Sequence, residues 1–164
     1  MKTALTDPDA GPPLARCIHQ LSHLKQGGTK WGKAPHKPVL LLTLMELIAS
    51  RKITENQIRL TPDLVEGFRA NFEILASPGH EGDVTLPFFY LKNEGFWFLK
   101  ASKGFQIDTC IRSVKTWNER LEYAHFSDEF YGLLTSSETR ELLRETLLDT
   151  YFAPKKMAYL TGQR

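Results

Sequence analysis

The sequence predicts one α+β domain that is mainly helical, with a winged-helix-like helical core and a short β-hairpin. Apolar residues recur at helical spacing in several separate stretches, which indicates amphipathic helices. One aromatic-rich stretch, 84–99, has the composition of paired strands around a turn. The chain has 164 residues, of which 41% are hydrophobic and 24% charged, a balance that supports a single buried core.

Three helices are expected in the first half of the chain. Apolar residues at helical spacing span 14–24 and stop before a pair of glycines. A second helix is expected over 38–50, because Pro38 suits the first position of a helix and an apolar run follows it. A third helix is expected over 62–75. This order of helix, helix, turn and helix is typical of a winged-helix arrangement.

The β-hairpin is expected in the aromatic-rich stretch. Residues 84–91 are predicted to form an edge or irregular strand, because Pro87 cannot donate a hydrogen bond to a neighbouring strand. Asn-Glu-Gly at 93–95 supplies the turn, and 96–99 is the returning strand.

Further helices complete the expected fold. They are placed at 109–121, at 128–134 and after Thr135. The last of these is indicated by Thr135 and Glu138, which have the spacing of a capping box. The buried stripe of the last helix is expected to consist of Leu142, Leu143, Leu147, Leu148 and Tyr151.

The domain itself is expected at 14–154. Residues 1–13 are expected to be a flexible N-terminal segment, and 155–164 a basic tail or linker. The two cysteines lie far apart, and no stretch has the length of a transmembrane helix or the pattern of a signal peptide. We therefore expect a cytoplasmic protein with reduced thiols and no membrane partner.

Positive charge is concentrated in two parts of a nearly neutral chain. The formal net charge is only +2, yet lysine and arginine outnumber acids over 25–52 and 100–120. A segregated basic surface favours a polyanionic partner, and a merely solvated charged face is the alternative.

No residues stand at catalytic spacing. His19 and His23 lie four positions apart on the first expected helix, but no third ligand accompanies them, so we interpret them as a solvated helix face. Neither a phosphate-binding glycine loop nor a nucleophile motif is found. We expect no catalytic residues, no metal site and no cofactor.

Two short stretches set a stiff proline beside a cation or an aliphatic side chain. They are Ala-Pro-His-Lys-Pro at 34–38 and Thr-Leu-Pro-Phe-Phe-Tyr at 85–90. Together they predict a small apolar pocket with a positive rim. His36 and Lys37 stand at the N-terminal mouth of the second helix, where the helix dipole and unbonded N–H groups favour phosphate.

The same stretches carry a family resemblance. Pro-His-Lys-Pro followed by Val-Leu-Leu-Leu, then Ile-x-x-Asn-x-Ile, a Phe-rich helix, and Leu-Pro-Phe-Phe-Tyr-Leu before Gly-Phe-Trp resemble the DNA sulfur-binding domain of type IV, McrA-like HNH restriction endonucleases. The similarity covers 14–152. It implies recognition of double-stranded DNA carrying a phosphorothioate, in which sulfur replaces one non-bridging phosphate oxygen. It also implies an HNH nuclease domain in related proteins, with this chain as the recognition module alone.

The resemblance further implies that the sulfur pocket consists of His36, Lys37, Leu86, Pro87 and Tyr90. The chain departs from the family's pattern at three of these positions. Lys37 stands where the family has arginine, Leu86 where it has tyrosine, and Tyr90 where it has a small residue.

A sulfur pocket of this composition has a physical rationale. Sulfur is larger, softer and less strongly hydrated than oxygen, so walls formed by Pro87, Leu86 and the Lys37 stem favour it through dispersion and cheaper desolvation. Burying an ordinary phosphate oxygen there without a donor costs on the order of 1–3 kcal/mol. The Lys37 ammonium and the His36 ring are expected to meet the remaining charged oxygen.

Residues in nearby loops are expected to contact the rest of the DNA. The candidates are Lys30, Lys33, Ser77 and His80, with His80 placed to reach base edges and Lys33 to touch phosphate. Two alternatives stay open at this point. One is a sulfur-independent winged-helix DNA-binding or regulatory domain, and the other is an interaction module that does not bind DNA.

Overall fold

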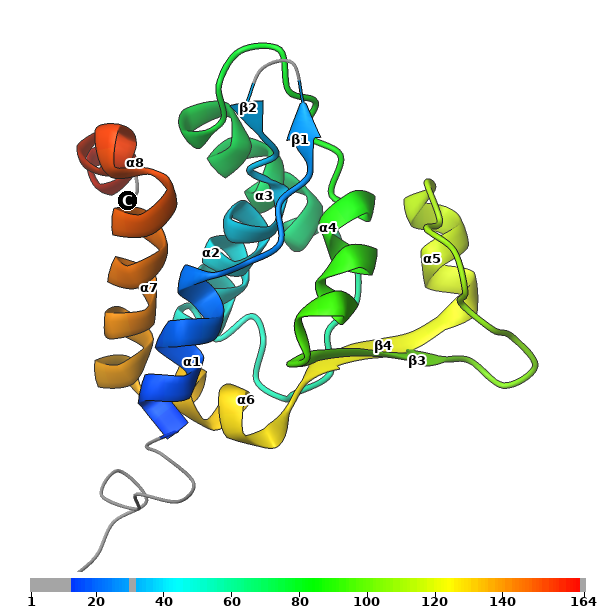
Figure 1. The fold of residues 1–164 in the computed structure, drawn as a ribbon. Coiled ribbons are helices and arrows are strands. Elements are labelled where there is room, and N and C mark those ends of the chain that lie inside the picture. Colours follow the sequence, from blue (N-terminus) through cyan, green and yellow to red (C-terminus); the bar gives the residue numbers. More distant parts are fainter. Residues whose placement is uncertain (1–12, 30–31, 163–164) are drawn as a thin grey trace, which may run out of the picture.

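The computed structural model describes residues 13–29 and 32–162 and has a mainly helical fold with two short, two-stranded antiparallel sheets, β1–β2 and β3–β4 (Figure 1). This architecture confirms the predicted fold class. The elements in chain order are α1 (Pro13–Ser22), β1 (Gly28–Thr29), β2 (Gly32–Lys33), α2 (His36–Ala49), α3 (Pro62–Leu75), α4 (Thr85–Tyr90), the 3-10 helix η2 (Leu91–Glu94), β3 (Trp97–Ala101), α5 (Val114–Arg120), β4 (Leu121–Phe126), α6 (Asp128–Thr135), α7 (Ser137–Tyr151), the 3-10 helix η3 (Ala153–Lys155) and α8 (Lys156–Gly162).

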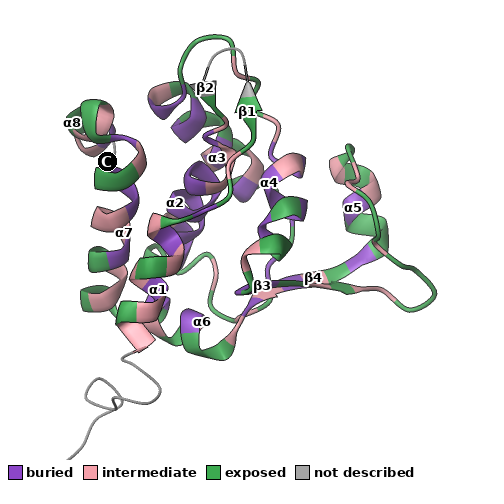
Figure 2. Ribbon diagram, in the orientation of Figure 1, coloured by how far each residue is buried: buried purple, intermediate pink, exposed green. Residues whose placement is uncertain are grey.

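Helix α2 is the centre of the core. It contacts α3, α4, α6 and α7, and the side chains from Pro38 to Met45 are all buried (Figure 2). A helix that is apolar on all sides can be stable only when neighbours cover every face. The near-continuous apolar run after Pro38 therefore becomes the central element, as predicted.

The start of α2 differs from the prediction by two residues. Pro35 is its N-cap, and Pro38 occupies the third helical position and not the first. Because the first turn of a helix has N–H groups without intrahelical partners, a proline at that position loses no hydrogen bond. His36 and Lys37 consequently belong to the first turn of the helix.

The predicted strand at 84–91 is wrong, because most of this stretch is helical. Asp83 precedes α4, and its Oδ1 accepts hydrogen bonds from the Thr85 N–H (3.0 Å) and the Thr85 hydroxyl (2.6 Å). Pro87 is the third residue of α4, where its missing N–H is again harmless. The aromatic residues that suggested a strand lie in this helix, from which Phe88 and Phe89 pack into the core.

The predicted hairpin partner is wrong for the same reason. Strand β3 pairs antiparallel with β4, which comes some twenty residues later, and the two strands run side by side from the end next to α6 toward α5 (Figure 1). On the other side of β4, Ile58 forms an isolated bridge with Ala124. The Asn-Glu-Gly turn ends η2, with Gly95 at a φ of 92° that glycine adopts without strain.

The C-terminal helices agree with the prediction only in part. Helix α6 is confirmed, α5 is shorter than the expected 109–121, and α7 begins after Ser136, so the capping box is wrong. The Thr135 hydroxyl donates instead to the Gly132 carbonyl at 2.8 Å. Of the expected stripe, Leu143, Leu147 and Leu148 are buried and Tyr151 is half-buried, whereas Leu142 is 50% exposed because it lies one residue off that face.

Residues expected to form a tail after 154 are instead packed on the domain. Helix α8 contacts α3, and its Tyr159 is fully buried. The Lys156 ammonium pairs with Glu145 (2.6 Å) and Asp149 (2.8 Å) on α7. The expected flexible segment at 1–13 lies outside the described residues except for Pro13, which begins α1. Among the helices that are described, none has both the length and the apolar composition required to traverse a bilayer.

Candidate functional site

The five residues predicted for a sulfur pocket line one cavity of about 530 Å³. His36 and Lys37 come from the first turn of α2, and Leu86, Pro87 and Tyr90 come from α4. Four further residues complete the lining: Lys25, Gln26, Gly27 and Ala34. The two proline-containing stretches, fifty positions apart in sequence, thus meet across a single hollow.

The α4 side of the cavity is its apolar wall. Leu86, Pro87 and Tyr90 share one helix face; Pro87 is buried, Leu86 is half-buried and Tyr90 is 42% exposed. On the opposite side of α4, Phe88 packs edge-on against Trp97 and Trp117, with ring centroids 5.4 and 5.1 Å apart. The wall is therefore held from behind by the core.

The start of α4 is held by a charged clamp. Arg112 donates two hydrogen bonds to Asp83 Oδ2, from Nε at 3.1 Å and from Nη2 at 2.8 Å. Burial by itself raises the pKa of Asp83, but the hydrogen bonds from Thr85 and Arg112 outweigh it and leave this pKa below its ordinary value. Asp83 is thus a charged acceptor that orients the first turn of α4.

His36 lines the cavity and is hydrogen-bonded to the loop before α4. Its Nε2 donates to the Glu81 carbonyl at 2.6 Å, and its ring lies 4.9 Å from that of Phe72. Burial lowers the pKa of His36 below its ordinary value of 6.5, although the hydrogen bond to Glu81 acts in the opposite direction. The lowered pKa favours the neutral form of the His36 ring, so the positive charge expected at the rim does not come from this residue.

The Lys37 ammonium is engaged inside the protein. Its Nζ lies 2.6 Å from Glu94 Oε2 and donates to the Lys25 carbonyl at 2.8 Å. The side chains of Lys37 and Glu94 are only 11% and 5% exposed. Lys37 therefore presents its aliphatic stem to the cavity, while its charge is neutralised by an acid that sequence reasoning had treated as an ordinary turn residue.

Three of the four predicted DNA-contacting residues lie beside this cavity, and the fourth, Lys30, falls outside the described residues. Lys33, Ser77 and His80 line a second hollow of about 220 Å³, which shares Gln26 with the first. The rings of His80 and His36 meet edge-on with centroids 6.4 Å apart. Lys33 and Ser77 are exposed at this second hollow, and their contact with DNA stays a prediction.

Sequence reasoning missed the residues before β1 that complete the lining. Gln26 Nε2 donates to the Ala34 carbonyl (2.8 Å), and the Ala34 N–H donates to the Gly27 carbonyl (2.7 Å). These bonds close the segment around β1 and β2 against the start of α2. The glycine pair in this loop was the sequence signal for this part of the lining, because glycines allow close approach of the backbone to a ligand.

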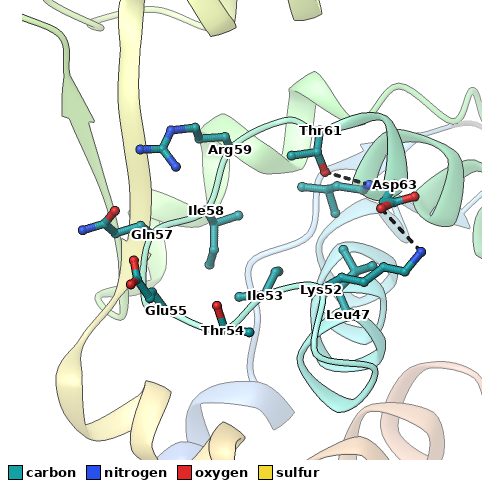
Figure 3. A pocket seen from close by; sticks show the side chains of 11 residues that line it. Leu47, Lys52, Ile53, Thr54, Glu55, Gln57, Ile58, Arg59, Thr61 and Asp63 are labelled. Carbon is teal, nitrogen blue, oxygen red and sulfur yellow. Dashed lines mark hydrogen bonds and ion pairs between the residues drawn. The ribbon is translucent and has the colours of Figure 1, made fainter.

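A further hollow of about 270 Å³ lies at the other end of α2 (Figure 3). Its lining includes Lys52, Glu55 and Arg59, and Lys52 pairs with Asp63 at 3.5 Å. No residue predicted for DNA binding lies here. Among the described residues there is also no cluster of His, Cys, Asp and Glu able to hold a metal ion.

Fold and cavity together define a small helical recognition domain whose apolar hollow opens beside a helix N-terminus. The chain matches the family described as "ScoMcrA-like, DNA sulfur-binding domain" over residues 14–162. It therefore belongs to that family, and the relationship inferred from its motifs is confirmed. The match includes all of α8 and extends beyond the expected domain end at 154.

Solved structures of such domains share the fold at low sequence identity. The sulfur binding domain of ScoMcrA complexed with phosphorothioated DNA is 18% identical, with a TM-score of 0.62 over 82% of this chain and 85% of that chain. The corresponding SprMcrA complex is 21% identical, with a TM-score of 0.62 over 84% and 85%. The type IV phosphorothioation-dependent restriction endonuclease ScoMcrA is 18% identical, with a TM-score of 0.61, and this chain covers 29% of it. No curated protein sequence matches the chain.

Proposed function

We propose that this domain binds double-stranded DNA carrying a backbone phosphorothioate and holds the sulfur in the cavity between α2 and α4. The observation that carries the proposal is the convergence of all five motif residues on that cavity. Membership of the DNA sulfur-binding domain family and the solved complexes of ScoMcrA and SprMcrA with phosphorothioated DNA support it.

The chemistry of the cavity suits sulfur better than oxygen. Pro87 and Leu86 offer carbon atoms and no donors, and the Lys37 stem adds another apolar surface. A phosphate oxygen placed there gives up water without compensation, whereas sulfur has less hydration to lose and gains dispersion contacts. Selection for sulfur thus comes from uncharged atoms of the wall.

Attraction to the rest of the DNA comes from the rim. Lys25 and Lys33 are exposed beside the two hollows, and the positive end of the α2 dipole lies at the first turn, which supplies His36 and Lys37 to the lining. These groups act on any phosphate, because they recognise charge alone. We assign base contacts to the loop with Ser77 and His80, which borders the second hollow.

The test is a binding titration with matched duplexes that differ by one phosphorothioate, with its two diastereomers presented separately. A sulfur reader binds one diastereomer strongly and the unmodified duplex weakly. Equal affinity for all duplexes would identify a sulfur-independent DNA-binding domain. Absence of binding to every duplex would identify an interaction module of another kind.

We also propose that this chain recognises DNA without cutting it. The described residues offer no metal-ligating cluster, and the cavity contains no nucleophile or general base pair at catalytic spacing. Incubation of the pure protein with sulfur-modified duplex and Mg²⁺ or Mn²⁺ is expected to leave the DNA intact on a denaturing gel. Reproducible cleavage that scales with protein concentration would contradict the proposal.

A further inference from the structure

We infer that Glu94 sets the sulfur selectivity of the cavity by neutralising Lys37, so that this lysine contributes an apolar wall and not a free charge. The inference rests on the proposed function and concerns the same site. Glu94 belongs to η2, which follows α4 directly, and it does not line the cavity itself. It acts from behind the wall, as a positioning residue.

The geometry leaves the two charged groups little capacity for other partners. Glu94 Oε2 accepts from Lys37 Nζ at 2.6 Å and from the Lys25 backbone N–H at 3.1 Å. Lys37 Nζ also donates to the Lys25 carbonyl at 2.8 Å. Two of the three donors of the ammonium are thus satisfied inside the protein, and both side chains are largely withdrawn from solvent.

One carboxylate therefore holds two segments of the cavity lining together. Lys25 precedes β1 and Lys37 lies in the first turn of α2, and both line the cavity that Glu94 supports. A second contact strengthens the same junction, because Lys25 Nζ donates to the Asn93 carbonyl at 3.2 Å. The position of the Lys37 stem in the wall is consequently fixed by its charged end.

Neutralisation matters because charge does not distinguish the two ligands. Phosphate diesters and phosphorothioate diesters carry the same negative charge, so a free ammonium attracts both and raises the affinity for ordinary DNA as well. Specificity is a difference between two affinities. An ammonium held by Glu94 removes a shared attraction and keeps the apolar contact that only sulfur uses well.

The decisive variant is Glu94→Gln, which keeps the size of the side chain and releases the Lys37 charge. We expect it to bind the unmodified duplex about tenfold more tightly at low salt, as one charge-assisted contact would do. The salt dependence for unmodified DNA should steepen by about one unit. The sulfur duplex should gain less, because the released lysine leaves the wall, so the sulfur preference narrows.

Two companion variants separate charge from structure. Lys37→Met/Glu94→Gln removes both charges and retains an unbranched stem, so it is expected to keep the sulfur preference and the salt dependence of the parent. Asp63→Asn changes the net charge as Glu94→Gln does, but at the exposed pair with Lys52, and is expected to leave the sulfur preference unchanged. Thermal unfolding of each variant shows that it is folded.

The outcomes distinguish this inference from the proposed function. A parent that does not prefer sulfur overturns the proposed function. A parent that prefers sulfur, with the same preference in a folded Glu94→Gln variant, overturns the role of Glu94 alone. If Glu94→Gln does not fold, the double variant decides: retained selectivity without either charge supports the inference, and lost selectivity overturns it.

Discussion

The two ends of α2 have the same kind of ion pair in opposite surroundings. At the N-terminal end, Lys37 and Glu94 are 11% and 5% exposed, and their atoms lie 2.6 Å apart. Just beyond the C-terminal end, Lys52 and Asp63 are 54% and 59% exposed and lie 3.5 Å apart (Figure 3). A buried pair depends on both partners, whereas an exposed pair is replaced by water at little cost.

The hollows beside these two ion pairs differ in the polarity of their linings. The cavity at the N-terminal end is walled by Leu86, Pro87 and the Lys37 stem, while the hollow at the C-terminal end is bordered by polar and charged side chains such as Glu55 and Arg59. Since α2 has 14 residues and rises about 1.5 Å per residue, the two sites are separated by roughly 20 Å. The comparison indicates that a lysine near a pocket is not by itself a ligand for phosphate, because an acidic partner inside the protein can neutralise its charge.

Among the substitutions that test this comparison, Lys37→Ala is expected to have the largest effect, which is a loss of folding stability. The substitution leaves the Glu94 carboxylate buried beside Lys25 without its counter-charge, which lowers the free energy of unfolding by about 3 kcal/mol. Urea denaturation followed by circular dichroism measures the change. Lys37→Met/Glu94→Gln should recover much of the loss, and an equal loss in both variants would show that the pair's charge is not the cause.

Pro87→Ala tests the apolar wall of the same cavity. The substitution removes about two methylene-sized contacts with the sulfur and leaves every charge in place, so the affinity for the phosphorothioate duplex should fall roughly tenfold. The affinity for the unmodified duplex should stay within about twofold, as measured by fluorescence anisotropy. Pro62→Ala, an exposed proline at the first position of α3, is the matched control. Parallel losses on both duplexes would contradict the role of the wall.

The pH dependence of His36 is expected to have a smaller effect. Its pKa is lowered by burial, so the unfolded chain takes up a proton more readily than the folded one at pH values below 6.5. The stability that the neutral ring contributes is complete above pH 6.5 and is lost as the pH falls through the lowered pKa. Unfolding free energies measured across this range should fall with pH in the parent and fall less in His36→Gln.

Lys52→Ala should have the smallest effect. The Lys52 ammonium is exposed and screened, so its removal is expected to change the free energy of unfolding by no more than about 0.5 kcal/mol. The sulfur preference should be the same as in the parent. A loss comparable to that of Lys37→Ala would remove the distinction between the two ends of α2.

Much of the helical framework could be predicted from the sequence. The apolar run after Pro38 predicted α2, and Thr61 before Pro62 provided a real N-cap for α3, whose hydroxyl accepts from the Leu64 N–H at 3.2 Å. These features depend on residues within a few positions of one another, where helical spacing and missing N–H groups act directly. The family's motifs also identified five residues that line the cavity: His36, Lys37, Leu86, Pro87 and Tyr90.

The helical state of α4, the second helix that lines the cavity, could not be predicted from local sequence. The aromatic residues around Pro87 are compatible with a strand or a helix. In the structure they belong to α4, and β3 pairs with the later β4. Composition over six residues does not decide between these states, since burial of Phe88 satisfies either one.

The sequence by itself determined which side chains are apolar, which are charged and where helices begin, because these are properties of neighbouring residues. Tertiary structure alone decided what the charges do. Lys37 meets Glu94, which lies 57 positions away, and the half-buried His36 ring packs against Phe72 and donates to the Glu81 carbonyl. The physical reason is that the state of a charge depends on the solvent and partners around it, and packing between distant segments supplies both.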